Sequence, residues 1–319
     1  MKLSNLDIVK ITESAALAAS KHFGNGDKYK IDEDASNAMR QSLNDLDFIA
    51  EVIFGEYEKD NAPGLFNGEI LGRYKNEYLD KRYNDQIYEI IVDPVDGTTK
   101  TSIGGNDAIS IMAIGEQDCF NKNIDSFYMK KLAVGPKLLQ SDIDIKNKPL
   151  TNLTLISSFL GKKLEEVTVC ILNRQRNIEL IDEIRKIGCR LKLINDCDIN
   201  TCVLAGLHHK IDIYLGIGGT TEGILSAVCL KILGGKFQGI LCDKEGKEKN
   251  GKVLDIKSLI KKNVVCNITG ITDGSLLRGV VYSDKGPITS SLVLNSYNNT
   301  YQLIETHHSI QEENAGNTI

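Results

Sequence analysis

The chain has 319 residues, 41% hydrophobic and 25% charged, which is typical of a soluble globular protein with one large domain or two ordinary ones. Its formal charge of −5, with no Lys/Arg cluster interleaved with aromatic residues, argues against nucleic acid as a partner and favours a small molecule. The N-terminal segment lacks an apolar leader, and no run of about 18 apolar residues occurs, so we expect a cytoplasmic protein with no membrane partner. Eight cysteines without CxxC pairs argue against a zinc site or a disulfide scaffold.

The first part of the chain is predicted to form two helices and a strand. Apolar residues at helical spacing predict a helix over 6–23, and a second helix is expected to begin near Asp34 after a charged segment. Acidic residues ahead of a helix are usually caps, so Asp32 is a candidate ligand only with outside support. Residues 48–54 predict a buried strand that ends at Glu56, in a loop that is either an exposed charged tip or part of a metal site.

The stretch over residues 88–101, YEIIVDPVDGTTKT, carries the strongest chemical signal. Residues 88–92 predict a buried strand, and Pro94 is expected to end its ladder pairing. Asp93 and Asp96 then lie on one tight turn, where both carboxylates can face a hard cation, and the backbone N–H groups of the following Gly-Thr-Thr offer an anion site. The alternative is an ordinary strand-to-turn transition, because Asp-Pro and Asp-Gly are common in turns.

Two further strands, over 108–114 and 131–134, precede a polar stretch at 142–152 that gives the clearest position for a boundary. We therefore expect a metal- and phosphate-binding lobe at 1–150 and a sugar-binding α/β lobe at 151–310. The polar tail over 311–319 is expected to be disordered.

The second half is predicted to alternate strands and helices, which implies a mainly parallel sheet. The elements in order are strand 167–172, helix 178–187, strand 190–194, a helix to 207, strand 211–215 and a helix to 233.

Polar residues follow three of these strands. Arg174 and Arg176 come directly after the first and are well placed to bind a phosphate. Asp196 and Asp198 follow the next, where they either bind sugar hydroxyls or cap a helix. The third leads into a Gly-rich run, residues 216–223, which by itself is a weak phosphate-loop signal because it matches neither a P-loop nor G-x-G-x-x-G.

These motifs together resemble the class II fructose-1,6-bisphosphatases, members of the lithium-sensitive sugar and inositol phosphatase superfamily. The resemblance runs through nearly the whole chain, in ITESAALAA, GNGDK, FGEYEKDNAPGL, VDPVDGTTKT, YMKKLAVGP, ILNRQR, INDCDI, GIGGTTEGILSA and NITGITDGSLLRG. It implies a layered α/β/α/β/α fold and removal of the 1-phosphate from fructose 1,6-bisphosphate by a metal-activated water, with Mg²⁺ or Mn²⁺. It also implies a homo-oligomer, a dimer or a tetramer.

The resemblance assigns roles residue by residue. Metal ligands fall on Asp32, Glu56, Asp93 and Asp96, with Asp93 and Glu56 also counted as catalytic. Thr98 falls on the threonine that orients the attacking water. Substrate contacts fall on Lys28, Asp60, Tyr128, Arg174, Arg176, Asp196, Asp198 and Glu222. Beside the resemblance, we expect the backbone N–H groups near Gly97 and Thr98 to bind the reacting phosphate.

Three positions depart from the family pattern: Asp96 stands where glutamate is more usual, Tyr57 where glycine is, and Asn61 where an acidic residue is. Two alternative functions follow. One is a related phosphatase for sedoheptulose 1,7-bisphosphate or an inositol phosphate, and the other is a non-catalytic sugar-phosphate-binding descendant.

Overall fold

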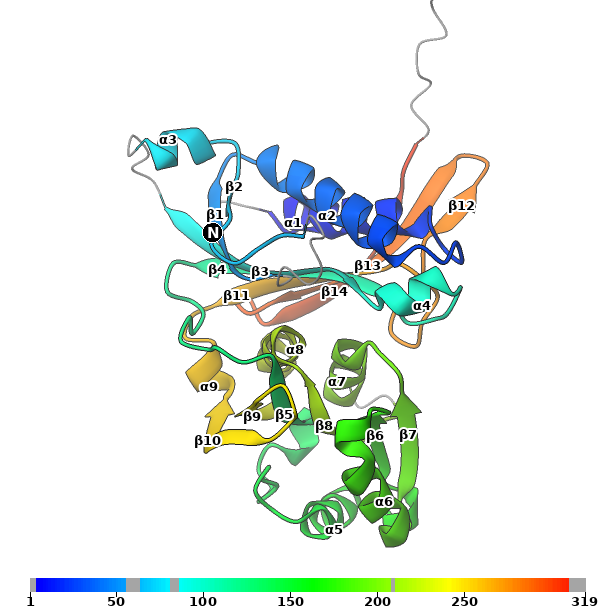
Figure 1. The fold of residues 1–319 in the computed structure, drawn as a ribbon. Coiled ribbons are helices and arrows are strands. Elements are labelled where there is room, and N and C mark those ends of the chain that lie inside the picture. Colours follow the sequence, from blue (N-terminus) through cyan, green and yellow to red (C-terminus); the bar gives the residue numbers. More distant parts are fainter. Residues whose placement is uncertain (1–3, 56–63, 81–85, 208–209, 310–319) are drawn as a thin grey trace, which may run out of the picture.

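Five layers of helices and sheets make up the computed structural model, which describes residues 4–55, 64–80, 86–207 and 210–309. In Figure 1 the layers follow one another from top to bottom as helices, sheet, helices, sheet and helices. The outer helices are α1 (Asn5–Ser20) and α2 (Lys28–Asn44) on one side and α5 (Pro149–Leu160) and α6 (Ile178–Ile187) on the other, with α7 (Asp198–Gly206) and α8 (Thr220–Leu233) between the sheets. The α/β/α/β/α expectation is confirmed.

The first sheet has the strand order β12-β13-β11-β4-β3-β1-β2, with β14 paired to β13. Among the strands that the structure describes in this sheet, β1 and β3 pair in parallel and the other pairings are antiparallel. The strands are β1 (Ile49–Phe54), β2 (Ile70–Leu71), β3 (Ile87–Asp96), β4 (Ile109–Glu116), β11 (Val264–Gly270), β12 (Val281–Ser283), β13 (Gly286–Asn295) and β14 (Thr300–His307).

The second sheet has the order β10-β9-β5-β8-β6-β7. Its strands are β5 (Tyr128–Val134), β6 (Thr168–Leu172), β7 (Arg190–Ile194), β8 (Ile213–Gly219), β9 (Lys236–Cys242) and β10 (Glu248–Asp255). Strand β6 pairs in parallel with β7 and β8, whereas β5, β9 and β10 pair antiparallel. The prediction of a mainly parallel sheet was therefore wrong for half of this sheet, because β5 comes from an earlier part of the chain and pairs with both β8 and β9.

The division between the sheets does not coincide with the boundary expected at residue 150. The second sheet already includes β5, and the chain returns to the first sheet at β11. The predicted tail, 311–319, lies outside the described residues. The remaining elements are short: α3 (Lys75–Leu79), α4 (Thr98–Ser102), α9 (Ile256–Leu259) and 3₁₀ turns at Pro136–Leu138, Leu164–Glu166 and Gln175–Asn177.

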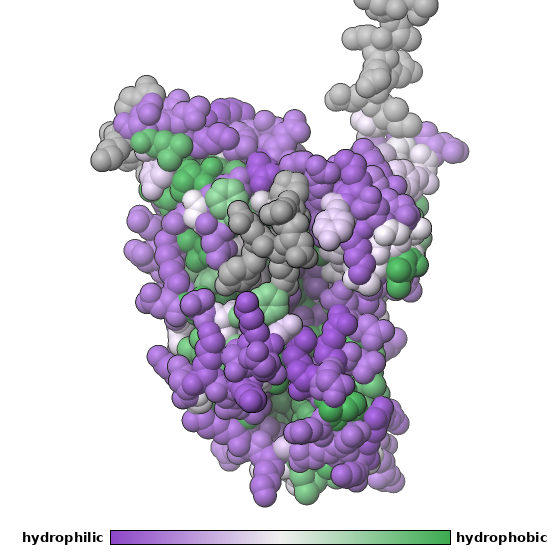
Figure 2. All heavy atoms as spheres, in the orientation of Figure 1, coloured by the Kyte–Doolittle hydropathy of each residue, from purple (hydrophilic) through white to green (hydrophobic). Residues whose placement is uncertain are grey.

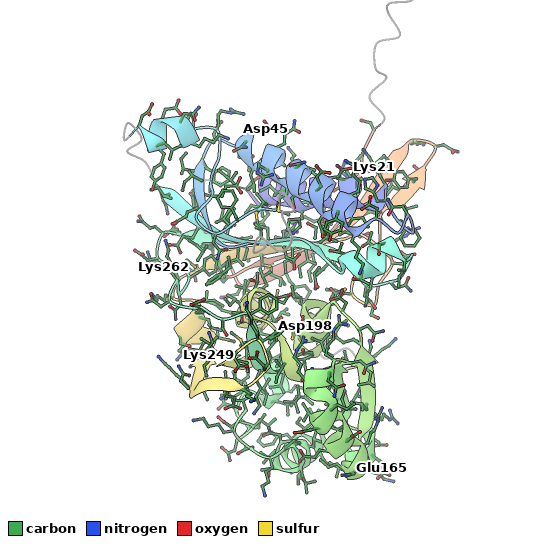
Figure 3. All side chains as sticks on the ribbon, viewed as in Figure 1. Lys21, Asp45, Glu165, Asp198, Lys249 and Lys262 are labelled. Carbon is green, nitrogen blue, oxygen red and sulfur yellow. The ribbon has the colours of Figure 1, made fainter. Side chains whose placement is uncertain are left out.

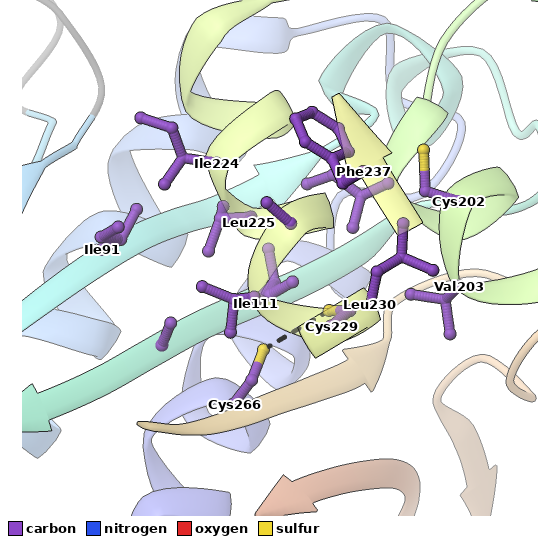
Figure 4. Close-up of a cluster of buried hydrophobic side chains, with 14 of the residues drawn as sticks. Ile91, Ile111, Cys202, Val203, Ile224, Leu225, Cys229, Leu230, Phe237 and Cys266 are labelled. Carbon is purple, nitrogen blue, oxygen red and sulfur yellow. Dashed lines mark hydrogen bonds between the residues drawn. The ribbon is translucent and has the colours of Figure 1, made fainter. Parts of the chain in front are cut away.

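Three apolar cores hold the five layers together. One joins α1 and α2 to the first sheet, and another joins α5 and α6 to the second. The third lies between the sheets, where Leu225 and Cys229 of α8 pack against Ile91 and Ile111 of the first sheet (Figure 4). In this core the Cys229 and Cys266 sulfurs are 3.8 Å apart, with both thiols free. The central helices thus fix the position of one sheet relative to the other. The polar residues at the ends of the strands are held in place by the same packing.

The outer face seen in Figure 2 is mainly hydrophilic, with smaller apolar areas. Within the residues that the structure describes, no helix combines the length and apolar character needed to cross a bilayer.

Candidate active site

A β-bulge positions the two aspartates of the DPVDGTT motif. Pairing with β4 continues from Asp93 opposite Ile111 to Asp96 opposite Ile109, with a register shift between them. The prediction that pairing stops at Pro94 was therefore wrong. The bulge leaves extra backbone on β3 opposite a single residue of β4, and a bulge accommodates proline because ladder bonding is interrupted there. Asp93 Oδ1 accepts a hydrogen bond of 3.2 Å from the Val95 amide, which holds the turn.

Gly97 links this strand to the short helix α4. Its φ of 109° lies in the left-handed region, and a Cβ there would lie 2.6 Å from Cys197 Sγ. Glycine is required on both counts. The thiol of Cys197 also lies 3.4 Å from the Asp96 carbonyl oxygen. The loop before α7 therefore packs directly against the Asp96 turn, which brings the two sheets' polar strand ends together.

Asp32 reaches this turn from helix α2. The helix begins at Lys28, not near Asp34 as expected, because Asp27 is the N-cap and its side chain accepts the Lys30 amide. Asp32 consequently lies on a rigid helix, where its Oδ1 accepts a hydrogen bond of 2.6 Å from the Thr98 hydroxyl. Burial raises the pKa of Asp32 to about 6, against the opposing effects of this hydrogen bond and of the Lys28 charge.

Arg174 and Arg176 lie after β6, on the other side of the site. The Arg176 guanidinium is 4.1 Å from the centre of the Tyr128 ring, and its Nε donates a hydrogen bond of 2.9 Å to the Ile217 carbonyl. These two contacts fix the plane of the guanidinium while its terminal nitrogens remain available for an oxyanion. Arg174 is exposed, and its charge acts on Asp196 by lowering that carboxyl's pKa against the larger effect of burial.

Asp196 and Asp198 flank the start of α7, which begins at Asp198. Asp198 is only 3% exposed and lies in the interior between the sheets, as its label in Figure 3 shows. Its Oδ2 accepts hydrogen bonds from Lys131 and Tyr214. Burial raises the pKa of Asp196, and the neighbouring Asp198 adds to the shift. Both aspartates face the same space as the arginines.

A cavity of about 570 Å³ brings most of the predicted site residues together. Those that line it are Asp32, Asp93, Asp96, Gly97, Thr98, Tyr128, Arg174, Arg176, Asp196, Asp198 and Glu222. Lys28 does not line it and is exposed on the first turn of α2. Glu56, Tyr57, Asp60 and Asn61 lie outside the described residues.

Asp96 has the most unfavourable environment in the cavity. It is 5% exposed, and its Oδ2 has no hydrogen-bond partner among the described residues. Burial raises its pKa well above the usual value, and the charges of Asp93, Asp196, Asp198 and Glu222 raise it further. A buried carboxylate surrounded by other carboxylates calls for a cation, and all the donors are oxygen atoms of the kind that Mg²⁺ and Mn²⁺ prefer.

The donor set fits a divalent ion in its chemistry. In the part of the chain that the structure describes, no three Asp, Glu, His or Cys side chains are grouped closely enough to hold an ion by themselves. One of the four predicted ligands, Glu56, lies outside that part.

Several residues at the cavity carry little or no signal in the sequence. The Gly-rich run, residues 216–223, contains no loop: its first half belongs to strand β8, which extends to Gly219, and its second half begins helix α8 at Thr220. Thr220 and Thr221, at the start of α8, line the cavity. Cys197 and Lys131 were also missed, since a single cysteine and one of two adjacent lysines carry no distinctive signal. The alternation of β5, which points Lys130 and Lys131 to opposite faces, was the one available clue.

A family model and curated relatives of known name match this chain over nearly its whole length. The family model described as "Bacterial fructose-1,6-bisphosphatase, glpX-encoded" matches residues 2–308. Proteins named D-fructose 1,6-bisphosphatase class 2/sedoheptulose 1,7-bisphosphatase are similar along the full length. The one from Synechocystis is 34% identical, covering 95% of each chain, and the one from Crocosphaera subtropica is 33% identical, covering 97% of this chain and 96% of the relative.

Among solved structures, an extragenic suppressor protein from Pyrococcus furiosus has a TM-score of 0.39 at 13% identity, covering 80% of this chain and 91% of its own. The IMPase of Thermotoga maritima has a TM-score of 0.38 at 14% identity, covering 79% of this chain and 91% of its own.

Proposed function

Because the chain belongs to the bacterial class 2 fructose-1,6-bisphosphatase family, we propose that its cavity is where fructose 1,6-bisphosphate loses its 1-phosphate. The protein is a phosphoric monoester hydrolase, and the products are fructose 6-phosphate and inorganic phosphate. The observation that carries the proposal is the mixed charge of the cavity lining: the carboxylates of Asp32, Asp93 and Asp96 come from α2 and β3, and Arg174 and Arg176 come from the segment after β6. A sugar with a phosphate at each end matches this division.

The family is metal-dependent, and the site would hold Mg²⁺ or Mn²⁺. Asp32, Asp93 and Asp96, together with Glu56, would hold the ions. When bound, such ions neutralise the charge of a phosphate monoester and lower the pKa of a water molecule. The buried Oδ2 of Asp96 supports this assignment, since it has no hydrogen-bond partner within the described ranges and without a cation it is desolvated and repelled by its neighbours.

Thr98 and Asp32 would orient the attacking water. The Thr98 hydroxyl proton points at Asp32 Oδ1, 2.6 Å away, so its oxygen keeps lone pairs that can accept a hydrogen bond from water. Asp32 in turn can accept a proton through the threonine. The chemistry is then mainly orientation and charge stabilisation by groups already in place, with no covalent phosphoenzyme.

The arginines would hold the distal phosphate, and Asp198 with Asp196 would bind sugar hydroxyls. Arg176 is the better preorganised of the two arginines because it is stacked on Tyr128 and bonded to the Ile217 carbonyl. A planar guanidinium held in this way loses little side-chain entropy when it binds phosphate.

Arg176→Lys is expected to raise the KM for fructose 1,6-bisphosphate about 10-fold, because the charge stays but the stacking and the carbonyl bond, together on the order of 1–2 kcal/mol, are lost. Steady-state kinetics measures the change. Arg185→Lys on the exposed side of α6 is the matched control, and its KM should equal that of the wild type. Equal KM values for the two variants would remove Arg176 from the phosphate site.

The proposed function is tested by phosphate release across a panel. Fructose 1,6-bisphosphate, sedoheptulose 1,7-bisphosphate and inositol phosphates are each assayed with Mg²⁺ and with Mn²⁺, and Asp93→Ala serves as the inactive control. We expect the highest kcat/KM for fructose 1,6-bisphosphate. Sedoheptulose 1,7-bisphosphate is the second candidate, since the names of the curated relatives include that activity.

Two outcomes of this panel would replace the proposal. A kcat/KM that is highest for an inositol phosphate would make the protein a phosphatase of another substrate class. Binding of the bisphosphates without release of phosphate under either metal would make it a sugar-phosphate-binding descendant.

A cytoplasmic location and a homo-oligomeric state complete the proposal. All eight cysteines are free and most are buried, in keeping with a reducing compartment. The dimer or tetramer expected from the resemblance is measured by sedimentation equilibrium.

A further inference from the structure

A buried ion pair that the proposed reaction does not use lies directly beneath the cavity surface. Lys131, on β5, is completely buried, and its ammonium group lies 2.7 Å from Oδ2 of Asp198. Asp198 itself lines the cavity. A lysine buried to this degree is rare unless it is paired, and the desolvation of both charges is costly. The pair therefore calls for a reason beyond stability.

Tyr214 adds a second donor to the same carboxylate oxygen. Its phenol, also completely buried, donates a hydrogen bond of 2.9 Å to Asp198 Oδ2. Lys131 and Tyr214 come from adjacent strands, β5 and β8, which pair antiparallel. Because both donors bind Oδ2, they fix the orientation of the carboxylate about the Cβ–Cγ bond. Oδ1 is then the oxygen that remains for a ligand.

Two glycines of the Gly-rich run make room for this pair. A Cβ at Gly218 would lie 2.4 Å from Asp198 Oδ2 and 2.8 Å from Lys131 Nζ. A Cβ at Gly223 would lie 3.1 Å from Lys131 Cε. Neither glycine has a positive φ, so the backbone conformation does not require them. The run that resembles a weak phosphate loop instead clears space for a buried lysine and carboxylate.

Lys131 remains charged in this position. Burial acts to lower the pKa of Lys131, but the negative charges of Asp198 and Glu222 outweigh it, so that the pKa is raised. The ammonium group thus offsets part of the negative charge that the carboxylates place on the sugar side of the cavity.

We propose that Lys131, with Tyr214, is a positioning residue that fixes the Asp198 carboxylate so that Oδ1 accepts a hydroxyl group of the sugar bisphosphate. The inference rests on the proposed function and assigns the specificity for a polyhydroxylated substrate to a pair beneath the cavity surface. Lys131 itself does not touch the substrate. Its effect passes through the orientation and charge of Asp198.

Lys131→Met removes the charge at nearly constant volume. Because a fixed hydrogen bond to the sugar acts equally in the bound substrate and in the transition state, the KM for fructose 1,6-bisphosphate is expected to rise about 10-fold, with kcat within about twofold of the wild type. The inhibition constant of inorganic phosphate, which has no sugar, should not change. Lys130→Met is the matched control: Lys130 is the preceding residue, it pairs with Glu248 at the surface, and its variant should behave as the wild type.

A double-mutant cycle tests whether Lys131 acts through Asp198. Asp198→Asn is expected to raise KM as Lys131→Met does, and the double variant should be no worse than either single variant. Multiplied effects in the double variant would mean that Lys131 acts independently and would overturn the inference.

Two further measurements separate a folding defect from a defect in substrate binding. Lys131→Met leaves the buried Asp198 carboxylate without its counter-ion, so the melting temperature of this variant should fall, and Lys131→Met/Asp198→Asn should regain part of the loss. Tyr214→Phe removes a single hydroxyl and should raise KM about threefold without unfolding the protein. If Lys131→Met is insoluble, the KM of Tyr214→Phe becomes the measurement that tests the inference.

The outcomes distinguish this inference from the proposed function. A wild type that hydrolyses fructose 1,6-bisphosphate, together with unchanged KM in Lys131→Met and Tyr214→Phe, overturns the inference alone. A lower kcat with unchanged KM shows a merely structural role and also overturns it. A wild type that releases no phosphate from the bisphosphate overturns the proposed function instead.

Discussion

Asp96→Asn is expected to abolish turnover and, at the same time, to stabilise the metal-free protein. The side chain keeps its shape but loses the charge that a divalent ion requires, so kcat should fall by at least about 10²-fold. Without metal, the same charge is buried and repelled by the surrounding carboxylates, and its Oδ2 has no hydrogen-bond partner in the part of the chain that the structure describes. Removing it relieves that repulsion, and the melting temperature of the chelated protein should rise by several degrees.

Phosphate release and thermal unfolding in EDTA measure the two effects. Asp182→Asn is the matched control, because Asp182 lies on the exposed side of α6 and its side chain is 55% exposed. It should change neither quantity. An Asp96→Asn variant that keeps its activity would contradict the metal role of Asp96. One that melts no higher than the wild type in EDTA would contradict the account of its charge.

Asp96 was visible in the sequence, because the motif around it combines a buried strand with turn residues and two carboxylates. The same pattern singled out Arg176 and Asp198 in the segments that follow two strand-like runs, and both line the cavity. Parallel strands end at one edge of a sheet, so polar residues that follow them converge without any knowledge of long-range contacts. These features depend on short stretches of chain, which is why sequence patterns could predict them.

The remaining features depend on contacts between distant segments. The antiparallel insertion of β5 beside β8 decides that the second sheet is mixed, and it also brings Lys131 to Asp198. The KKLAV sequence does not indicate which of the two lysines is buried or which residue that lysine contacts. Likewise, the packing of Cys197 on Gly97 joins segments about a hundred positions apart in the chain. Tertiary pairing of this kind is outside the reach of local periodicity.

Asp32 shows an intermediate case. Its acidic neighbourhood could be read as helix caps, and Asp27 is indeed one. The helix begins earlier than the apolar pattern indicated, because polar residues fill its exposed first turns and leave the hydrophobic signal to start later. The early start is what makes Asp32 rigid enough to meet Thr98.

Metal-free protein is expected to lose stability as the pH rises from 5.5 to 8. In the folded state the pKa of Asp32 is raised to about 6, and the pKa values of Asp96 and Asp196 are also raised. A raised pKa means that the folded state binds the proton more tightly than the unfolded chain. The stabilising contribution is therefore complete below the unfolded value, near 3.8, and is lost as the pH rises through the folded value. Over the pH range in which such a group is protonated in the folded state but ionised in the unfolded chain, it lowers the free energy of unfolding by about 1.4 kcal/mol per pH unit.

A divalent ion should reverse this dependence. Ions bind the ionised carboxylates and displace their protons, so Mn²⁺ or Mg²⁺ stabilises the folded state more at pH 8 than at pH 5.5. Thermal unfolding is followed at both pH values in EDTA and in saturating metal, with potassium chloride at matched ionic strength as the control for screening. Two results would contradict a cation site built on these buried carboxylates. One is a metal-free protein whose stability increases between pH 5.5 and pH 8, and the other is an increase in melting temperature on adding metal that is the same at both pH values. The variant Asp96→Asn should flatten both curves, because it removes the carboxylate whose ionisation is opposed most strongly by its surroundings.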